Sequence, residues 1–115
     1  MLDIQTRQLP PDITVIEITG KITIGRDCQH LEWTAENLVR DKKNKIIFDL
    51  SGVTHIDSTG IGIIVMAAGE AKESGGQLRL AGVNGHLEHL LKVTSIDKVV
   101  AWDPTVREAA AAFQA

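Results

Sequence analysis

The spacing of hydrophobic positions along the chain of 115 residues alternates between a strand-like and a helical period. Short runs rich in Val, Ile and Leu predict five strands, and Pro10-Pro11-Asp12 marks a turn between the first two because proline cannot continue a ladder. The predicted strands are residues 4–9, 13–19, 45–50, 77–81 and 98–101. Apolar stripes at helical spacing predict four helices. They cover residues 27–42 and 59–74, a segment around Leu87, Leu90 and Leu91, and a segment that begins after Pro104.

The order of these elements predicts the fold class. After an initial hairpin, strands alternate with helices, which is typical of an α/β domain with a mixed, mostly parallel sheet. Residues 46–50 are almost continuously apolar, as expected for a strand buried on both faces, and residues 20–25 are predicted to be a loop. A chain of this length supports one domain, over residues 1–115.

Charge and composition exclude several classes of protein. A formal net charge of -3 and a pI of about 5.7 give no basic surface for a nucleic-acid backbone. The first residues lack the pattern of a signal peptide, and no apolar run approaches the roughly 18 residues of a membrane span. We therefore expect a cytoplasmic protein without membrane insertion. Cys28, the single cysteine, is expected to be a buried thiol on one helix face.

Motifs for cofactors, metals and catalysis are incomplete. Gly60-Ile61-Gly62 lacks the third glycine of a dinucleotide fingerprint, and no phosphate-binding loop occurs. A hydrolase elbow needs Gly two residues before the serine, whereas Ile56 precedes Ser58 there. His86 and His89 match no common zinc spacing and are expected at the surface. No cofactor, metal or catalytic residue is predicted, although a small enzyme or nucleotide-binding protein that uses Ser58 and Asp57 remains an alternative.

The stretch FDLSGVTHIDSTGIG, residues 48–62, combines a strand, a predicted loop over residues 51–57 and a helix that opens at Ser58 or Thr59. Asp and Ser at a helix start are ordinary caps, and this structural role is one interpretation. Gly60 and Gly62, however, cost the first turns about 1 kcal/mol each relative to Ala. Their missing side chains would let another molecule approach the backbone. A phosphate on Ser58 would meet the positive helix end and add about -1.5 to -2 charges beside Asp57.

The helix over residues 59–74 carries two apolar strips. The expected core strip consists of Ile61, Ile64, Val65, Ala68 and Ala71. The second strip consists of Ile63, Met66 and Ala67. If it is exposed, it forms a protein-binding patch next to Ser58, and if neighbouring helices cover it, it belongs to the core.

The run DLSGVTHIDSTGIGIIV resembles the signature of the STAS domain, as found in bacterial anti-sigma factor antagonists. The resemblance continues through the Gly75-Gly76 turn before LRLAG, the run LLKVTSID, and the closing strand and Ala-rich helix. Relatives often carry Gly-Glu-x-Asp after the second strand, where this chain has Gly20-Lys21-Ile22-Thr23. This departure concerns the choice of partner.

The resemblance implies a partner switch that regulates transcription. The unphosphorylated protein would bind a serine kinase that is also an anti-sigma factor, and so release a sigma factor. Phosphorylation at Ser58 would weaken this binding, and a serine phosphatase would reset it. ATP would belong to the kinase, and the protein itself would perform no catalysis. Thr59 is a second candidate acceptor.

The alternatives within the family are a scaffold in a stress-signalling complex and a subunit of a lipid-transport system, and homodimerisation is left open. The residues predicted to bind the partner are Asp57, Ser58, Thr59, Gly60, Gly62, Ile63, Met66, Lys21 and Thr23.

Overall fold

Five strands and four helices follow the order that the sequence pattern predicts. The computed structural model describes residues 2–83 and 85–113. The strands are β1 (Leu2–Leu9), β2 (Ile13–Ile22), β3 (Lys45–Ile56), β4 (Gln77–Ala81) and β5 (Ala101–Asp103). The helices are α1 (Arg26–Arg40), α2 (Ser58–Glu73), α3 (Gly85–Val93) and α4 (Val106–Phe113), and a short 3-10 helix covers Ile96–Lys98.

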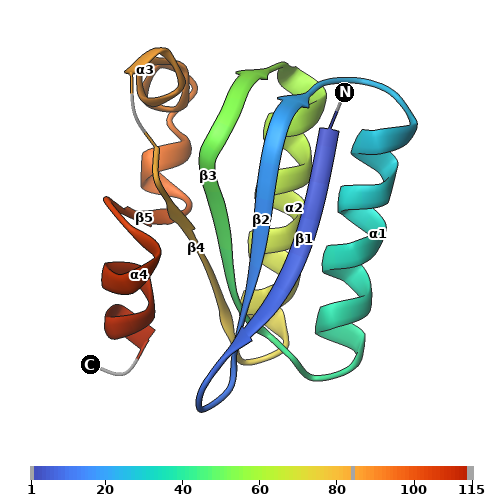
Figure 1. The fold of residues 1–115 in the computed structure, drawn as a ribbon, viewed down its shortest axis with the longest axis vertical. Coiled ribbons are helices and arrows are strands. Elements are labelled where there is room, and N and C mark those ends of the chain that lie inside the picture. The colour runs from blue at the N-terminus through green and yellow to red at the C-terminus, as the bar shows by residue number, and fades with distance from the viewer. Residues whose placement is uncertain (1, 84, 114–115) are drawn as a thin grey trace.

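The strands lie side by side in the order in which they occur in the chain (Figure 1). β1 pairs with β2 in antiparallel orientation, and the pairs β2–β3, β3–β4 and β4–β5 are parallel. The predicted α/β class with a mixed, mostly parallel sheet is confirmed. The carboxyl ends of β2 and β3 therefore lie at the same edge of the sheet, and α1 and α2 both begin there.

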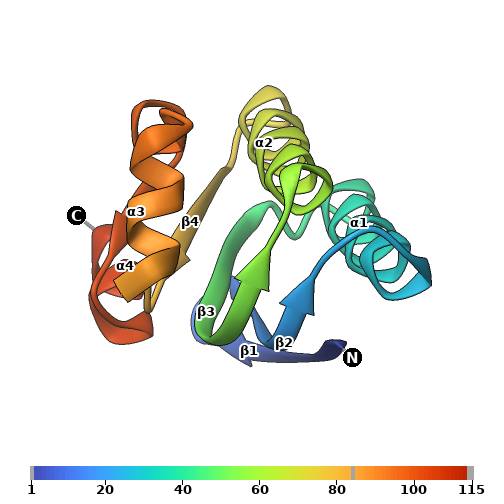
Figure 2. The ribbon, with the colours of Figure 1, turned by 90° about the horizontal axis from the view of Figure 1, so that it is seen from above.

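The two faces of the sheet are covered unequally. α1 and α2 lie side by side over one face, and α4 lies on the other (Figure 2). The larger core includes Leu31 of α1, Ile64 of α2 and Leu91 of α3, all packed in the cluster that contains Phe48 of β3. A smaller core joins α4, through Ala109, to the opposite face of the sheet. Thr105 caps α4, since its Oγ1 accepts a hydrogen bond from Glu108 N at 3.1 Å, as its spacing predicts.

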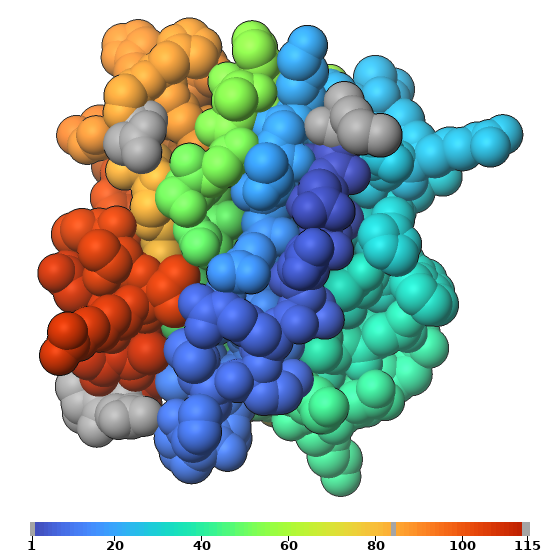
Figure 3. Space-filling model, viewed as in Figure 1, coloured from blue at the N-terminus to red at the C-terminus, as the bar shows by residue number. Residues whose placement is uncertain are grey.

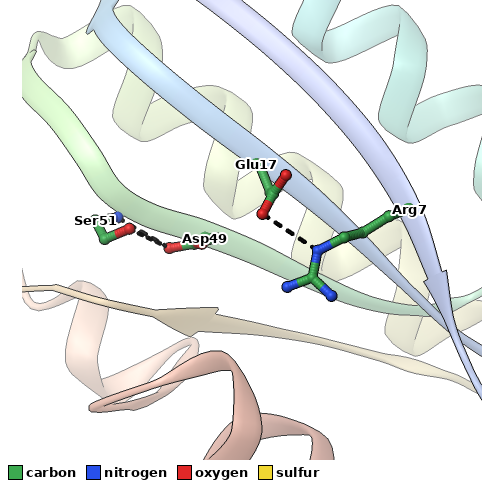
Figure 4. A network of polar contacts seen from close by, with 4 residues as sticks. All are labelled: Arg7, Glu17, Asp49 and Ser51. Atoms are coloured by element: carbon green, nitrogen blue, oxygen red, sulfur yellow. Dashed lines mark hydrogen bonds and ion pairs between the residues drawn. The ribbon is translucent and has the colours of Figure 1, made fainter.

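α4 covers only one end of its face (Figure 3). Beyond it the surface of β1, β2 and β3 is polar. Arg7 Nε of β1 donates to Glu17 Oε2 of β2 at 3.2 Å, in an ion pair between exposed side chains (Figure 4). This alternation of polar and apolar residues follows from the two-residue period of a strand with one solvated face.

Two strands are longer than predicted. β2 continues to Ile22 rather than ending at residue 19, and β3 continues to Ile56 rather than ending at residue 50. The predicted loop over residues 20–25 is therefore wrong for residues 20–22, and the predicted loop over residues 51–57 is wrong for residues 51–56. The reason is mutual pairing, because Gly20 lies opposite Val53 and Ile22 lies opposite Ile56. Each extension supplies the backbone partners of the other, which a local pattern cannot reveal.

The last strand is displaced from its prediction. The strand expected over residues 98–101 is Ala101–Asp103, and Lys98 instead ends the 3-10 helix. Val99 is 61% exposed, whereas Val100 is buried, so this Val-Val pair does not form a two-sided buried strand. Arg79 contributes to the placement of β5, because its Nε donates to Asp103 Oδ2 at 2.9 Å.

Candidate functional site

Asp57 and Ser58 occupy the first positions of α2. Asp57 is the N-cap, and its Oδ1 accepts a hydrogen bond from the backbone N–H of Gly60 at 3.0 Å. Ser58 is the first residue inside the helix, and its side chain is exposed. Within the described part of the chain its hydroxyl makes no hydrogen bond. Capping therefore falls to Asp57, and the exposed hydroxyl of Ser58 takes no part in it.

The second carboxylate oxygen of Asp57 holds a neighbouring loop. Its Oδ2 accepts a hydrogen bond from the backbone N–H of Ile24, which lies between β2 and α1, at 2.9 Å. The backbone N–H of Asp57 in turn donates to Ile22 O at 3.2 Å. The hydrogen bonds from Gly60 and Ile24 favour the ionised carboxylate and lower the pKa of Asp57. A single carboxylate thus joins the start of α2 to the loop before α1.

Glycine stands at positions 60 and 62 of the helix start for different structural reasons. A Cβ on Gly60 would collide with Ile22 O and lie 2.7 Å from Ile56 Cγ1, so the fold itself requires glycine there. A Cβ on Gly62 would meet nothing within 4 Å. The prediction that both glycines admit an external molecule is thus contradicted for Gly60, which is buried inside the domain. Gly62 retains that interpretation.

The second apolar strip of α2 is largely covered. Ile63 is 6% and Ala67 is 5% exposed, because α1 packs against this side of α2. Met66 is 49% exposed. Of the two alternatives for the strip, coverage by a neighbouring helix therefore holds for Ile63 and Ala67, and exposure holds for Met66. The prediction of Ile63 as an exposed partner-binding residue is wrong. Periodicity places the strip on a helix face, but it cannot tell that α1 covers that face.

A cavity of about 330 Å³ opens beside the start of α2. Its lining comes from the loop before α1, from α1 and from α2, and includes Ile24, Cys28, Thr59, Gly62 and Met66. Thr59, rather than Ser58, lines it. Cys28 is 1% exposed, as predicted, and burial, together with the carboxylates of Asp57 and Glu32, raises the pKa of its thiol.

Ile24 is the residue that sequence reasoning missed. Its side chain is 78% exposed, although its backbone is fixed by Asp57. A lone apolar residue in a loop carries no periodic signal. The only local indication is that it lies directly before Gly25 at the predicted helix start.

Lys21 and Thr23 lie at the same edge of the sheet as the helix start. Lys21 is exposed on β2, opposite His55 of β3, rather than in the predicted loop. Thr23 is half-buried and precedes Ile24 directly. Lys21 and Thr23, the two departures from the usual family sequence, thus lie on either side of Ile22. The carbonyl oxygen of Ile22 accepts a hydrogen bond from the backbone N–H of Asp57.

The enzyme alternative gains no geometric support. The hydrogen bond of His55 joins its Nδ1 to Thr54 Oγ1 at 3.0 Å, and in the described residues none joins it to Ser58. His86 and His89 are exposed on α3, as predicted. In residues 2–83 and 85–113, His, Cys, Asp and Glu side chains form no group of three or more suited to a metal ion.

The first part of the characteristic stretch has a structural role. Asp49 Oδ1 accepts hydrogen bonds from the backbone N–H of Ser51 at 3.0 Å and from Ser51 Oγ at 2.8 Å (Figure 4). These residues line a hollow with Glu17 and Gly52 on the open face of the sheet. Asp49 and Ser51 therefore stabilise β3, while the later residues form the site at the start of α2.

The fold and the site together define a small α/β domain with an exposed serine at the start of a helix. The chain belongs to the STAS domain family, whose model matches residues 4–109. None of the helices in the part of the chain that the structure describes is long and apolar enough to cross a membrane.

Known relatives agree with this assignment. The chain is 29% identical over 98 residues to a proposed anti-sigma factor antagonist of Thermotoga maritima, with 85% of this chain and 87% of the relative aligned. A crystal structure of a proposed antagonist from Thermotoga maritima matches with a TM-score of 0.89 and 25% identity, over 97% of this chain and 95% of that one. Bacillus SpoIIAA in its phosphorylated form shares the fold, with a TM-score of 0.74 and 15% identity over 94% of this chain and 96% of the other.

Proposed function

We propose that this protein is an anti-sigma factor antagonist that acts by partner switching. Its unphosphorylated form binds a serine kinase that is also an anti-sigma factor, and phosphorylation of Ser58 weakens the complex. The observation that carries the proposal is the exposed hydroxyl of Ser58, which lies at the first position of α2 and is not used in capping. The relatives named as antagonists support the same role.

The charge of a phosphate explains how the switch works. It adds about -1.5 to -2 charges, which the positive end of α2 tolerates. The backbone N–H groups of Gly60 and Ile24, however, already donate to the carboxylate of Asp57 and are not available to a phosphate. The added charge therefore stays at the surface, where a closely packed partner would have to bury it at a large desolvation cost, so the complex weakens.

The contact with the partner extends from Ser58 to the neighbouring exposed residues. Met66 and Ile24 present apolar side chains beside the cavity, and Gly62 leaves room between them for a close approach. Ile63 contributes as the floor of the cavity. Lys21 and Thr23 border the same area and are the residues that select the partner.

The other components supply the chemistry. The kinase binds ATP and transfers its phosphoryl group to Ser58, and a serine phosphatase removes it again. The antagonist performs no catalysis, contacts no nucleic acid and acts in the cytoplasm. Its effect on transcription is indirect, through release of the sigma factor from the shared kinase.

Mass spectrometry tests the proposal. The protein is purified from its native cells, or incubated with their extract and ATP, and fragment ions locate any phosphate. The expected result is one phosphate on Ser58. Parallel samples of Ser58→Ala and Thr59→Ala assign the acceptor, since only the former should lose the modification.

A phosphate on Thr59 alone would identify Thr59, which lines the cavity, as the acceptor in place of Ser58. Absence of phosphate in every growth condition, with full coverage of the peptide, would contradict the switch. It would favour a scaffold or transport subunit instead.

A further inference from the structure

α1 and α2 lie side by side (Figure 2). A groove lined by residues of both helices follows the line between them. It begins at the cavity of about 330 Å³ beside the start of α2 and closes, toward the middle of both helices, to a crevice that leaves no space for a water molecule. Glu32, Ile63 and Met66 line both parts, so the two are continuous. The residues beneath it, Cys28, Ala35, Ile63 and Ala67, are apolar and buried in the core, and the exposed apolar side chains at its open end are Ile24 and Met66.

The rims of this groove are acidic. Glu32 and Glu36 line it from α1, and Glu70 lines it from α2. Glu32, Glu36 and Glu70 line the same crevice, and Glu73 follows Glu70 by one helical turn. Burial, and then the negative charges of Glu36, Glu32 and Glu73, raise the pKa of Glu70. None of the four takes part in an ion pair among the described residues.

This arrangement does not stabilise the isolated domain. Glu70 and Glu73 lie in the last turn of α2, where the negative end of the helix disfavours carboxylates. Like charges that face each other across two helices add further repulsion. Glu32, Glu36 and Glu70 are half-buried and Glu73 is exposed, so a basic partner that reaches them would relieve this repulsion.

We propose that the groove between α1 and α2 binds a basic amphipathic helix of the anti-sigma partner. Helical segments commonly bind by laying an apolar face into a groove. Here the apolar face would lie over the cavity, against the exposed side chains of Met66 and Ile24, while Lys or Arg side chains on either side would pair with the carboxylates of both rims. The lined length, from Gly25 to Glu36, corresponds to about 16 Å, or roughly three helical turns.

The proposal rests on the proposed function only in naming the anti-sigma factor as the source of the helix. Thr59, Gly62 and Met66 line the groove, so it adjoins the switch residue Ser58 without including it. Binding in the groove therefore has its own determinants and can be measured on the unphosphorylated chain.

The probe is a designed peptide of 14 residues, capped at both ends, with Leu on one helical face and Lys and Arg on its flanks. A scrambled isomer of the same composition removes the amphipathic pattern and keeps the charge. Fluorescence anisotropy should show at least tenfold tighter binding of the amphipathic peptide. Amide shifts of the ¹⁵N-labelled chain should change at Cys28, Glu32, Met66 and Glu70.

A pair of double variants separates the groove from general charge. Glu36→Gln with Glu70→Gln should weaken binding about tenfold. The matched control, Asp3→Asn with Asp97→Asn, removes the same charge elsewhere and should change affinity less than twofold. The same variants are then measured against the anti-sigma factor itself, in a Ser58→Ala background that excludes phosphorylation.

Three results would overturn the proposal. The first is that the scrambled isomer binds as tightly as the amphipathic peptide. The second is that the control double variant loses as much affinity as the groove double variant. The third is that the chain self-associates and the groove variants abolish this association, since a second copy of the chain would then be the occupant. Absence of phosphate on Ser58 would remove the switch and leave peptide binding unchanged, so the two proposals fail separately.

Discussion

The carboxylate of Asp57 accepts a hydrogen bond from the backbone N–H of Ile24, with an Oδ2–N distance of 2.9 Å. The same side chain caps α2 through Gly60. The loop that carries the most exposed apolar residue near the site is thereby fixed to the helix that carries Ser58. A partner that touches both elements meets a surface whose two parts are already aligned.

Replacement of Asp57 by Asn should lower the melting temperature by a few degrees at neutral pH. Hydrogen bonds to the ionised form lower the pKa of Asp57 from its usual 3.8, so its stabilising effect is present above that value. The effect is lost as the pH falls through the lower pKa of the folded state. Thermal unfolding of both proteins, followed by circular dichroism from acid to neutral pH, should therefore show a difference that shrinks below about pH 4. A difference independent of pH would contradict this role.

The two glycines of α2 should respond oppositely to alanine. Gly62→Ala should stabilise the domain by about 0.5–1 kcal/mol, because the site has open space and Ala favours a helix. Gly60→Ala should destabilise it by about 1–3 kcal/mol, because Ile22 and Ile56 leave no room for a methyl group. Urea unfolding measures both free energies. Similar values for the two variants would show that the packing around Gly60 is misassigned.

Substitution by glutamate should distinguish the buried residue Ile63 from the exposed residue Met66 on α2. Ile63→Glu should lower the free energy of unfolding by at least about 3 kcal/mol, since it buries a charge. Met66→Glu should leave the fold intact and weaken the complex with the anti-sigma factor about tenfold. Val93→Glu, at an exposed residue of α3, is the control for added charge. If Met66→Glu and Val93→Glu bind alike, Met66 is outside the interface.

The affinity for the kinase should depend on the charge of the side chain at position 58. Ser58→Asp introduces a charge next to Asp57 and should weaken binding, whereas Ser58→Ala should remain bound when ATP is present. Calorimetry with the purified kinase, with and without ATP, measures the difference. Equal affinities of the two variants would remove the charge mechanism.

The ion pair between Arg79 and Asp103 should hold β5 in place. Both side chains are largely buried, at 16% and 17% exposure, and two hydrogen bonds of 2.9 Å and 3.3 Å join them. Arg79→Leu should cost about 1–3 kcal/mol of stability, because Asp103 then loses its partner. The double variant with Asp103→Leu should recover part of the loss. If the double variant loses at least as much free energy of unfolding as the two single variants lose together, the pairing is contradicted.

Much of this protein could be inferred from its sequence. The alternation of strands and helices, the turn at Pro10-Pro11 and the helix start at Ser58 follow from periodicity and capping, because these depend on neighbouring residues alone. The resemblance carried by the residues around Ser58 agrees with the family match over residues 4–109.

Tertiary structure alone decided the rest. β2 and β3 are extended by pairing with each other, Gly60 is required by Ile22 of a distant strand, and Ile63 is buried because α1 covers it. A period shows which side of a helix is apolar, but not which neighbour covers that side. The contact of Asp57 with Ile24 and the acidic groove between α1 and α2 arise for the same reason. They join segments that are far apart in the chain, and only the packing of the sheet and helices brings them together.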